Sequence, residues 1–204
     1  MNAPGSLIVA KALIPETEHS VASANVRTIR DEENRNVIDA IGSGAMSGGR
    51  IAVSVTCLLI AFIALIAMLS ALVGGIGHIF GQEGWTLEGA IGWVFSPVAW
   101  AIGTPWEKAQ LVGNFIGQKT VLNEFVGYTA FSAHVAELSP KAVLLSTFAL
   151  AGFANLSSIA IQIGTYGALV PERRSEVASL GPRALAGGLM TNLLNAAIVG
   201  VFAL

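Results

Sequence analysis

The chain has 204 residues, of which 53% are hydrophobic and 12% are charged, with a net charge of −2 and a mean hydropathy of +0.68. Soluble domains contain about 25% charged residues, so this composition predicts a membrane protein. The charge balance and the lack of a basic patch argue against a nucleic-acid partner. A single cysteine, Cys57, in an apolar run and three dispersed histidines argue against disulfides and a metal site.

The first 49 residues divide into a short apolar segment and a polar connector. Residues 1–14 contain Pro4, Gly5 and Lys11 and are shorter than the roughly 20 apolar residues of a membrane span. We expect them to be the tail of a truncated transmembrane helix. Residues 15–49 mix both charge signs, which predicts a solvated connector with a helical piece near "NVIDAIGSGA".

The next two segments are strongly apolar. Residues 51–80 contain no Lys, Arg, Asp or Glu, so we predict one long transmembrane helix over 50–82, with tilt. Residues 87–102 are apolar and Trp-rich, which is typical of a helix lying at the membrane surface. A short span broken at Pro97 is the alternative.

Residues 107–137 are too polar to face lipid. They include Lys108, Gln110, Asn114, Gln118, Lys119, Asn123 and Glu124. A re-entrant helical hairpin packed inside protein or against an aqueous cavity would tolerate them, with its turn near 121–123. A buried, unpaired carboxylate costs several kcal/mol, so Glu124 needs a compensating group, for which Lys119 is one candidate.

The last third of the chain predicts an interrupted helix, a loop and a final span. Ser139 and Pro140 suit the start of a helix over 139–170. The stretch "GFANLSS" at 152–158 interrupts it, either as an unwound substrate site or as small residues packed against neighbours. Residues 171–183 form a polar loop, and 184–204 a final apolar helix.

The basic residues predict an orientation in the membrane. Lys and Arg prefer cytoplasmic loops, so the loop with Arg173, Arg174 and Arg183 is expected inside, as is the 15–49 connector. The short polar loops suit the plasma membrane of a bacterium, that is, the inner membrane.

Several motifs occur in a specific order: "GQKTVLNEFVGY", "LSPKA", "FALAGFANLSSIAI" and "LGPRALAGG". With them, the chain closely resembles the C-terminal half of the concentrative nucleoside transporter family. The resemblance implies an all-α membrane protein, one of two inverted repeats, with transmembrane helices, a re-entrant hairpin and a partly unwound helix. It makes 50–82 a scaffold helix of a homotrimer and 85–204 the transport-domain repeat.

The same resemblance implies the site residues. The family binds the ribose of a nucleoside with residues that match Glu124, Phe153, Asn155 and Ser158. Such side chains suit a sugar, because a carboxylate accepts hydroxyl hydrogen bonds, Asn and Ser both donate and accept, and Phe offers an apolar face. Base recognition and the site of the coupling Na⁺ or H⁺ are expected in the N-terminal half, and no other cofactor is expected.

Three functions follow from these features. We expect the C-terminal portion of a cation-coupled nucleoside symporter, which supplies the ribose-binding half of the site but does not perform coupled transport alone. The alternative is a truncated, non-transporting membrane fragment that retains only packing and assembly. An enzyme with Glu124 as general base is disfavoured, because the sequence contains no nucleophile–base pair or phosphate loop.

Overall fold

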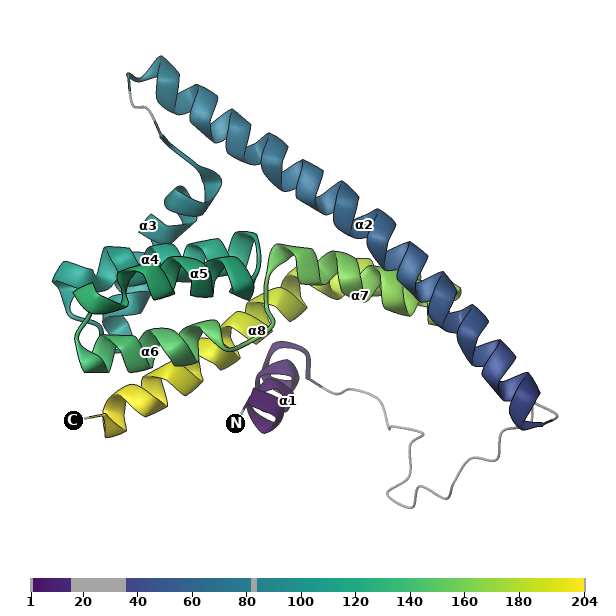
Figure 1. Ribbon diagram of the computed structural model, residues 1–204. Helices are drawn as coiled ribbons and strands as arrows, with labels where there is room; N and C mark the ends of the chain where they lie inside the picture. The colour runs from purple at the N-terminus through teal and green to yellow at the C-terminus, as the bar shows by residue number, and fades with distance from the viewer. Residues whose placement is uncertain (1, 16–35, 82–83, 204) are drawn as a thin grey trace.

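The computed structural model describes residues 2–15, 36–81 and 84–203, and over these residues it consists of helices and their connections (Figure 1). This confirms the all-α fold predicted from the sequence. The α-helices are α1 (Asn2–Leu13), α2 (Val37–Ile79), α3 (Leu87–Ala101), α4 (Trp106–Val121), α5 (Glu124–His134), α6 (Pro140–Leu150), α7 (Leu156–Leu169) and α8 (Arg174–Phe202). Two 3₁₀ turns, η1 (Val135–Glu137) and η2 (Pro171–Arg173), follow α5 and α7.

The long helix α2 begins earlier than the sequence indicated. We expected a polar connector up to residue 49 with a separate helical piece near "NVIDAIGSGA", but this piece, from Val37, is continuous with the long helix. Residues 16–35 of the connector lie outside the described residues. Asn36 caps the helix by accepting a hydrogen bond from the Asp39 amide at 2.9 Å. No proline follows before Ile79, so α2 continues for 43 residues, about 64 Å at 1.5 Å per residue.

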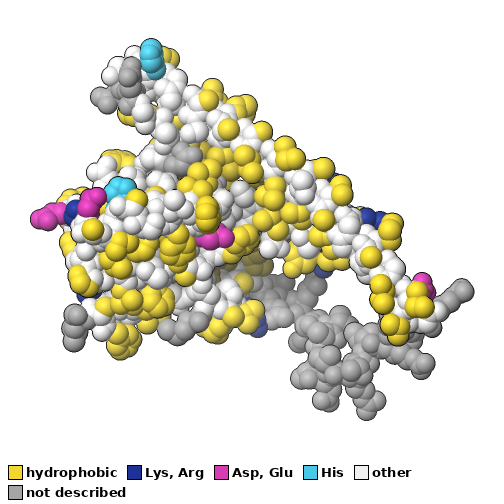
Figure 2. All heavy atoms as spheres, in the orientation of Figure 1, with side chains coloured by type: hydrophobic (Ala, Val, Ile, Leu, Met, Phe, Trp, Pro, Cys, Tyr) yellow, Lys and Arg dark blue, Asp and Glu magenta, His cyan; other side chains and the backbone are white. Residues whose placement is uncertain are grey.

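Among the residues that the structure describes, two helical segments are long and apolar enough to cross a membrane: α2, and the segment formed by η2 with α8. In Figure 2, hydrophobic side chains cover the visible side of α2 along most of its length. Of its most apolar 18-residue stretch, only 6% is buried inside the protein. The main contacts of α2 are with α7, where Gly164 lies directly against Val55.

The final helix also differs from the prediction. Residues 171–183 were expected to form a loop before a helix at 184, but α8 starts at Arg174 and passes through Pro182. Arg173 donates two hydrogen bonds of 2.7 Å to the Glu176 carboxylate, which stabilises the first turn. Gly181 then packs closely on Ile159 of α7. Pro182 removes one backbone hydrogen bond from α8. The Arg173–Glu176 pair and the packing of Gly181 on Ile159 offset that loss.

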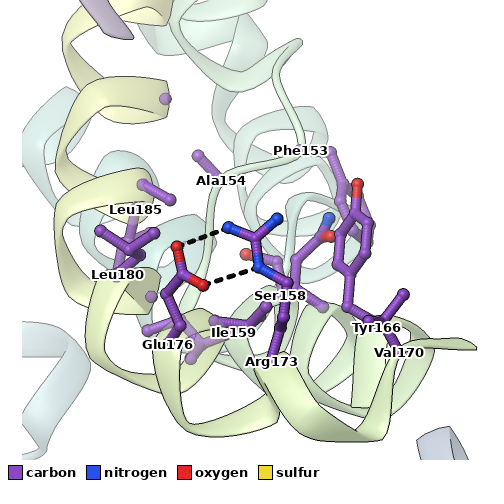
Figure 3. Close-up of a pocket in the computed structure, with 15 residues that line it drawn as sticks. Phe153, Ala154, Ser158, Ile159, Tyr166, Val170, Arg173, Glu176, Leu180 and Leu185 are labelled. Atoms are coloured by element: carbon purple, nitrogen blue, oxygen red, sulfur yellow. Dashed lines mark hydrogen bonds and ion pairs between the residues drawn. The ribbon is translucent and has the colours of Figure 1, made fainter. Parts of the chain in front are cut away.

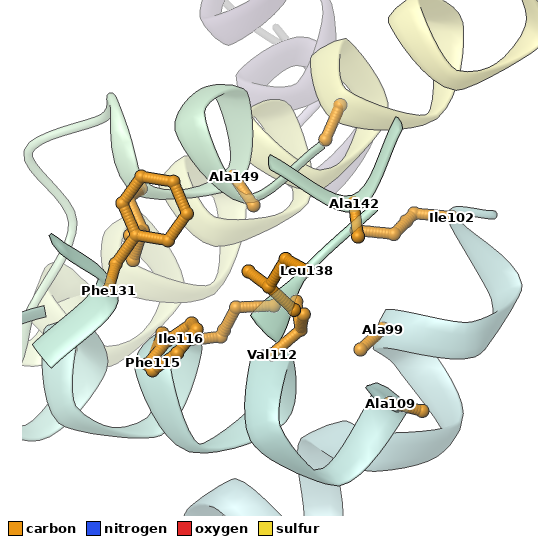
Figure 4. Close-up of a cluster of buried hydrophobic side chains, with 12 residues drawn as sticks. Ala99, Ile102, Ala109, Val112, Phe115, Ile116, Phe131, Leu138, Ala142 and Ala149 are labelled. Atoms are coloured by element: carbon orange, nitrogen blue, oxygen red, sulfur yellow. The ribbon is translucent and has the colours of Figure 1, made fainter. Parts of the chain in front are cut away.

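The buried core lies among α3, α4, α5, α6 and α8 (Figure 4). Phe115 of α4 is buried in it and makes an edge-to-face contact with Phe131 of α5, with ring centroids 5.8 Å apart. On the opposite side of α4, glycines allow α3 to come close. A Cβ atom on Gly113 would lie 2.5 Å from the carbonyl oxygen of Gly92 and 2.9 Å from the amide nitrogen of Ser96.

The helix expected over 139–170 is divided in two. Ser139 accepts the Ala142 amide hydrogen bond and caps α6, which ends at Leu150. The residues from 151 to 155 are not helical, and α7 starts at Leu156. The non-helical segment is therefore shorter than the interruption that we placed at 152–158.

We predict that Gly113→Ala separates α3 from α4. The added methyl overlaps the α3 backbone, and overpacking of this kind costs about 2 kcal/mol, or roughly 5 °C in melting temperature. Gly75→Ala on α2 is the matched control: its Cβ would have no neighbour within 4 Å, and Ala favours helix. Melting of the purified chain in detergent, followed by tryptophan fluorescence, checks this. Equal melting temperatures for the two variants would contradict the proposed close contact.

Candidate functional site

Glu124 lies at the tip of the helical pair α4–α5. Helix α4 ends at Val121, and Leu122 and Asn123 connect it to α5. The Asn123 side chain accepts a hydrogen bond from the Val126 amide at 3.0 Å and so caps α5. Glu124 is the first residue of α5 and is half-buried. Its carboxylate therefore sits at the positive end of a helix dipole.

Asn155 performs the same capping role for α7. Its side-chain oxygen accepts the Ser158 amide at 2.7 Å, and the Ser158 hydroxyl accepts the Asn155 amide at 3.3 Å. The same hydroxyl donates to the Asn155 carbonyl at 2.6 Å. This reciprocal capping box fixes the start of α7, and both residues are buried. In this structure Ser158 is thus engaged with the backbone of Asn155.

The two capped helix starts meet through one hydrogen bond. Asn155 Nδ2 donates to Glu124 Oε2 at 3.1 Å, across 31 residues of sequence. The carboxylate is thereby placed between the N-termini of α5 and α7, both of which favour negative charge. The structure thus joins Glu124 to Asn155, and Asn155 to Ser158.

Phe153 lies in the same non-helical segment and is 57% exposed. It lines a cavity of about 520 Å³ between α7 and α8, together with Ser158, whereas Glu124 and Asn155 do not line it. Figure 3 shows Phe153 and Tyr166 on one side of this cavity and Leu180 and Leu185 on the other. The Arg173–Glu176 ion pair also lines the cavity. Most of its lining is apolar.

Helix α8 packs against the non-helical residues 151–155, a contact that the sequence did not predict. The Asn192 side chain lies so close to Gly152 that a Cβ atom there would overlap its amide group. Asn192 Oδ1 accepts a hydrogen bond from Asn2 Nδ2 at 3.2 Å, and Asn195 Nδ2 donates to Asn2 Oδ1. Asn192 and Asn195 stand out in the final apolar helix, but their partners on α1 and at Gly152 follow only from the fold.

Lys119, the candidate counter-ion of Glu124, is fully buried in the last turn of α4. Within the described residues, its ammonium group has no hydrogen-bond partner, and no ion pair joins it to Glu124. The direct hydrogen-bond partner of Glu124 is Asn155.

The site thus joins Glu124, at the tip of the α4–α5 pair, to Asn155, at the break between α6 and α7. Residues 1–200 match the family described as Na⁺-dependent nucleoside transporter C-terminus. The chain belongs to this family. Its members are membrane transporters and not enzymes, so the enzyme alternative is excluded.

Individual relatives agree with this assignment. The chain is 48% identical to the uncharacterized transporter YutK of Bacillus subtilis (strain 168), covering 99% of this chain and 50% of YutK. It is 38% identical to the nucleoside permease NupC of Helicobacter pylori (strain ATCC 700392 / 26695), covering 99% of this chain and 49% of NupC. The chain thus spans about half the length of these relatives.

The fold agrees with a solved structure of the same family. A doubly substituted form of CNTnw in an outward-facing state superposes with a TM-score of 0.89 at 44% sequence identity. The superposition covers 98% of this chain and 48% of CNTnw.

We predict that Gly152→Ala distorts the non-helical segment and that Asn192→Ala partly rescues it. The methyl added at position 152 overlaps the Asn192 amide, so the single substitution costs about 2 kcal/mol, and removing the amide makes room for the methyl. Melting temperatures of the single and double variants in detergent form the double-mutant cycle. Thr191→Ala, the adjacent residue on α8, is the control and should give no rescue. Additive losses in the Gly152/Asn192 pair would contradict the contact.

Proposed function

We propose that this chain is the C-terminal portion of a cation-coupled nucleoside symporter and that it supplies the ribose-binding half of the substrate site. The observation that supports this most directly is the hydrogen bond between Glu124 and Asn155, which sets a carboxylate at the junction of two helix N-termini. Such junctions of interrupted helices are suited to polar substrates inside a membrane.

The chemistry of Glu124 suits a sugar. An ionised carboxylate has about four acceptor positions, and Asn155 occupies one of them. The remaining positions can accept hydrogen bonds from neighbouring ribose hydroxyls, each contributing about 1.5–3 kcal/mol. We therefore place the ribose at the Glu124–Asn155 junction and not in the apolar cavity between α7 and α8.

We propose a role at this position for each of the other three predicted residues. Exposed Phe153 would pack against the sugar or the base, as aromatic faces do in ligand sites. Asn155 has a second amide hydrogen beyond the one given to Glu124, which could be donated to a ribose oxygen. Ser158 would act at the sugar through a rearranged hydroxyl, since that group now bonds the Asn155 backbone.

We also propose the placement of the chain in the membrane. Helices α4 and α5 form the re-entrant hairpin, α3 lies along the surface, and α2 crosses the bilayer as the scaffold helix. Exposed apolar side chains on α2, such as Val53 and Ile60, would contact lipid or the other subunits of a homotrimer. The plasma membrane is the proposed location, with the arginines at the start of α8 on the cytoplasmic side. Coupling to Na⁺ or H⁺ is assigned to the other half of the transporter.

We predict that Glu124→Gln reduces uridine binding by the purified chain at least tenfold. The substitution removes the charge and replaces one acceptor oxygen with a donor, so charge-assisted bonds to the ribose are lost. Equilibrium binding of radiolabelled uridine in detergent measures the effect. Glu107→Gln is the matched control, because Glu107 is exposed at the distant start of α4.

The uridine-binding experiment distinguishes the proposed sugar site from the alternative function. Equal uridine binding by the unsubstituted chain and Glu124→Gln would contradict the proposed sugar site. Absence of binding in all forms would favour the alternative function, a non-transporting membrane fragment that retains only packing and assembly.

A further inference from the structure

Lys119 is the one charged side chain in the described part of the chain that is fully buried. Its ammonium group has no hydrogen-bond partner among the described residues. Burying a charge without a partner costs several kcal/mol, and a neutral residue of similar length would avoid this cost. We therefore expect a negative charge elsewhere in the protein to stabilise the ammonium group of Lys119.

The surroundings of Lys119 place it inside the α4–α5 pair. It lies in the last turn of α4, and Gly127 of α5 faces it: a Cβ atom on Gly127 would be 2.9 Å from Lys119 Cβ. The same position would be 3.2 Å from Leu150, the last residue of α6. The base of the Lys119 side chain therefore lies in the packed interior between α4 and α5.

The negative charge that we consider is that of Glu124, which lies in the same α4–α5 pair as Lys119. Within the described residues no ion pair closes between Lys119 and Glu124, so the carboxylate does not use an acceptor position on this ammonium group. The Tyr128 hydroxyl of α5 donates to the Thr147 carbonyl of α6 at 2.8 Å. Lys119 is thus a buried cation in the same helical pair as Glu124, five residues before it in the sequence.

We propose that Lys119 is a positioning residue of the sugar site, an internal cation that balances the charge of Glu124 without touching it. A direct ion pair would occupy acceptor positions of the carboxylate and compete with ribose hydroxyls. A cation held further away offsets the negative charge and leaves those positions free. This inference rests on the proposed function for the sugar, but the pairing of the two charges is independent of it.

A double-mutant cycle between Lys119→Met and Glu124→Gln tests the charge pairing without any ligand. Met has a similar length and is apolar, so it fills the same space. In the unsubstituted background we expect Lys119→Met to lower the melting temperature in detergent by about 5 °C, because Glu124 loses its balancing charge. In the Glu124→Gln background the same change should leave the melting temperature unchanged or raise it. Equal decreases in both backgrounds would overturn the inference.

Uridine binding tests the positioning role separately. We expect Lys119→Met to weaken binding about tenfold, an effect in the range of a nearby charge acting at an effective dielectric of about 20. Lys108→Met, on the same helix but partly exposed and 4.0 Å from Glu137, is the matched control and should bind as the unsubstituted chain does. Unchanged binding by Lys119→Met would overturn the positioning role. If the double-mutant cycle shows coupling but no form of the protein binds uridine, the charge pairing is retained and the sugar site is rejected.

Discussion

A carboxylate among apolar helices must be offset by positive charge and hydrogen-bond donors, and the architecture around Glu124 provides both. A continuous helix has only one N-terminus, at its end. Here the turn at Leu122 and Asn123 and the non-helical residues 151–155 create two additional N-termini within the body of the protein. The carboxylate lies where these meet, at the positive ends of α5 and α7. Both interruptions are therefore needed, because each one alone would place only a single helix N-terminus at the carboxylate.

An interrupted helix loses backbone hydrogen bonds and needs support from a neighbour, which α8 provides. Along one side of α8, Gly181 packs on Ile159 and Gly188 on Ala154, while Asn192 packs on Gly152. The spacing of seven and then four residues keeps these three positions on one side of the helix. An unbroken helix of 29 residues thus holds the end of the non-helical segment and the start of α7 in register. Glycine is favoured at 181 and 188 because a Cβ atom there would come within 3.0 Å of the side chains of Ile159 and Ala154.

The sequence predicted the helical class and the interruptions better than it predicted helix starts. Glycine, asparagine and serine at 152–158 are local signals, and a hairpin turn follows from polar residues in an apolar segment. The starts of α2 and α8 were misplaced because their first turns look like loops in composition. Two contacts between residues three apart stabilise these starts. The Asn36 side chain accepts a hydrogen bond from the backbone amide of Asp39, and the Arg173 side chain donates to the Glu176 carboxylate. The family resemblance named Glu124 and Asn155 together, but their hydrogen bond to each other depends on tertiary packing.

The choice of Asn at position 155 follows from two demands on one side chain. It must accept a hydrogen bond from the Ser158 amide to cap α7, which Asp, Ser or Thr would also do. It must also donate to Glu124 from the other side of the same group. Asp would cap the helix but place a second negative charge against the carboxylate, and the short hydroxyl of Ser or Thr would have to accept and donate through one atom. Only an amide separates acceptor and donor on two atoms at this length, so Asn155 is the residue that connects the capping of α7 to the carboxylate of Glu124.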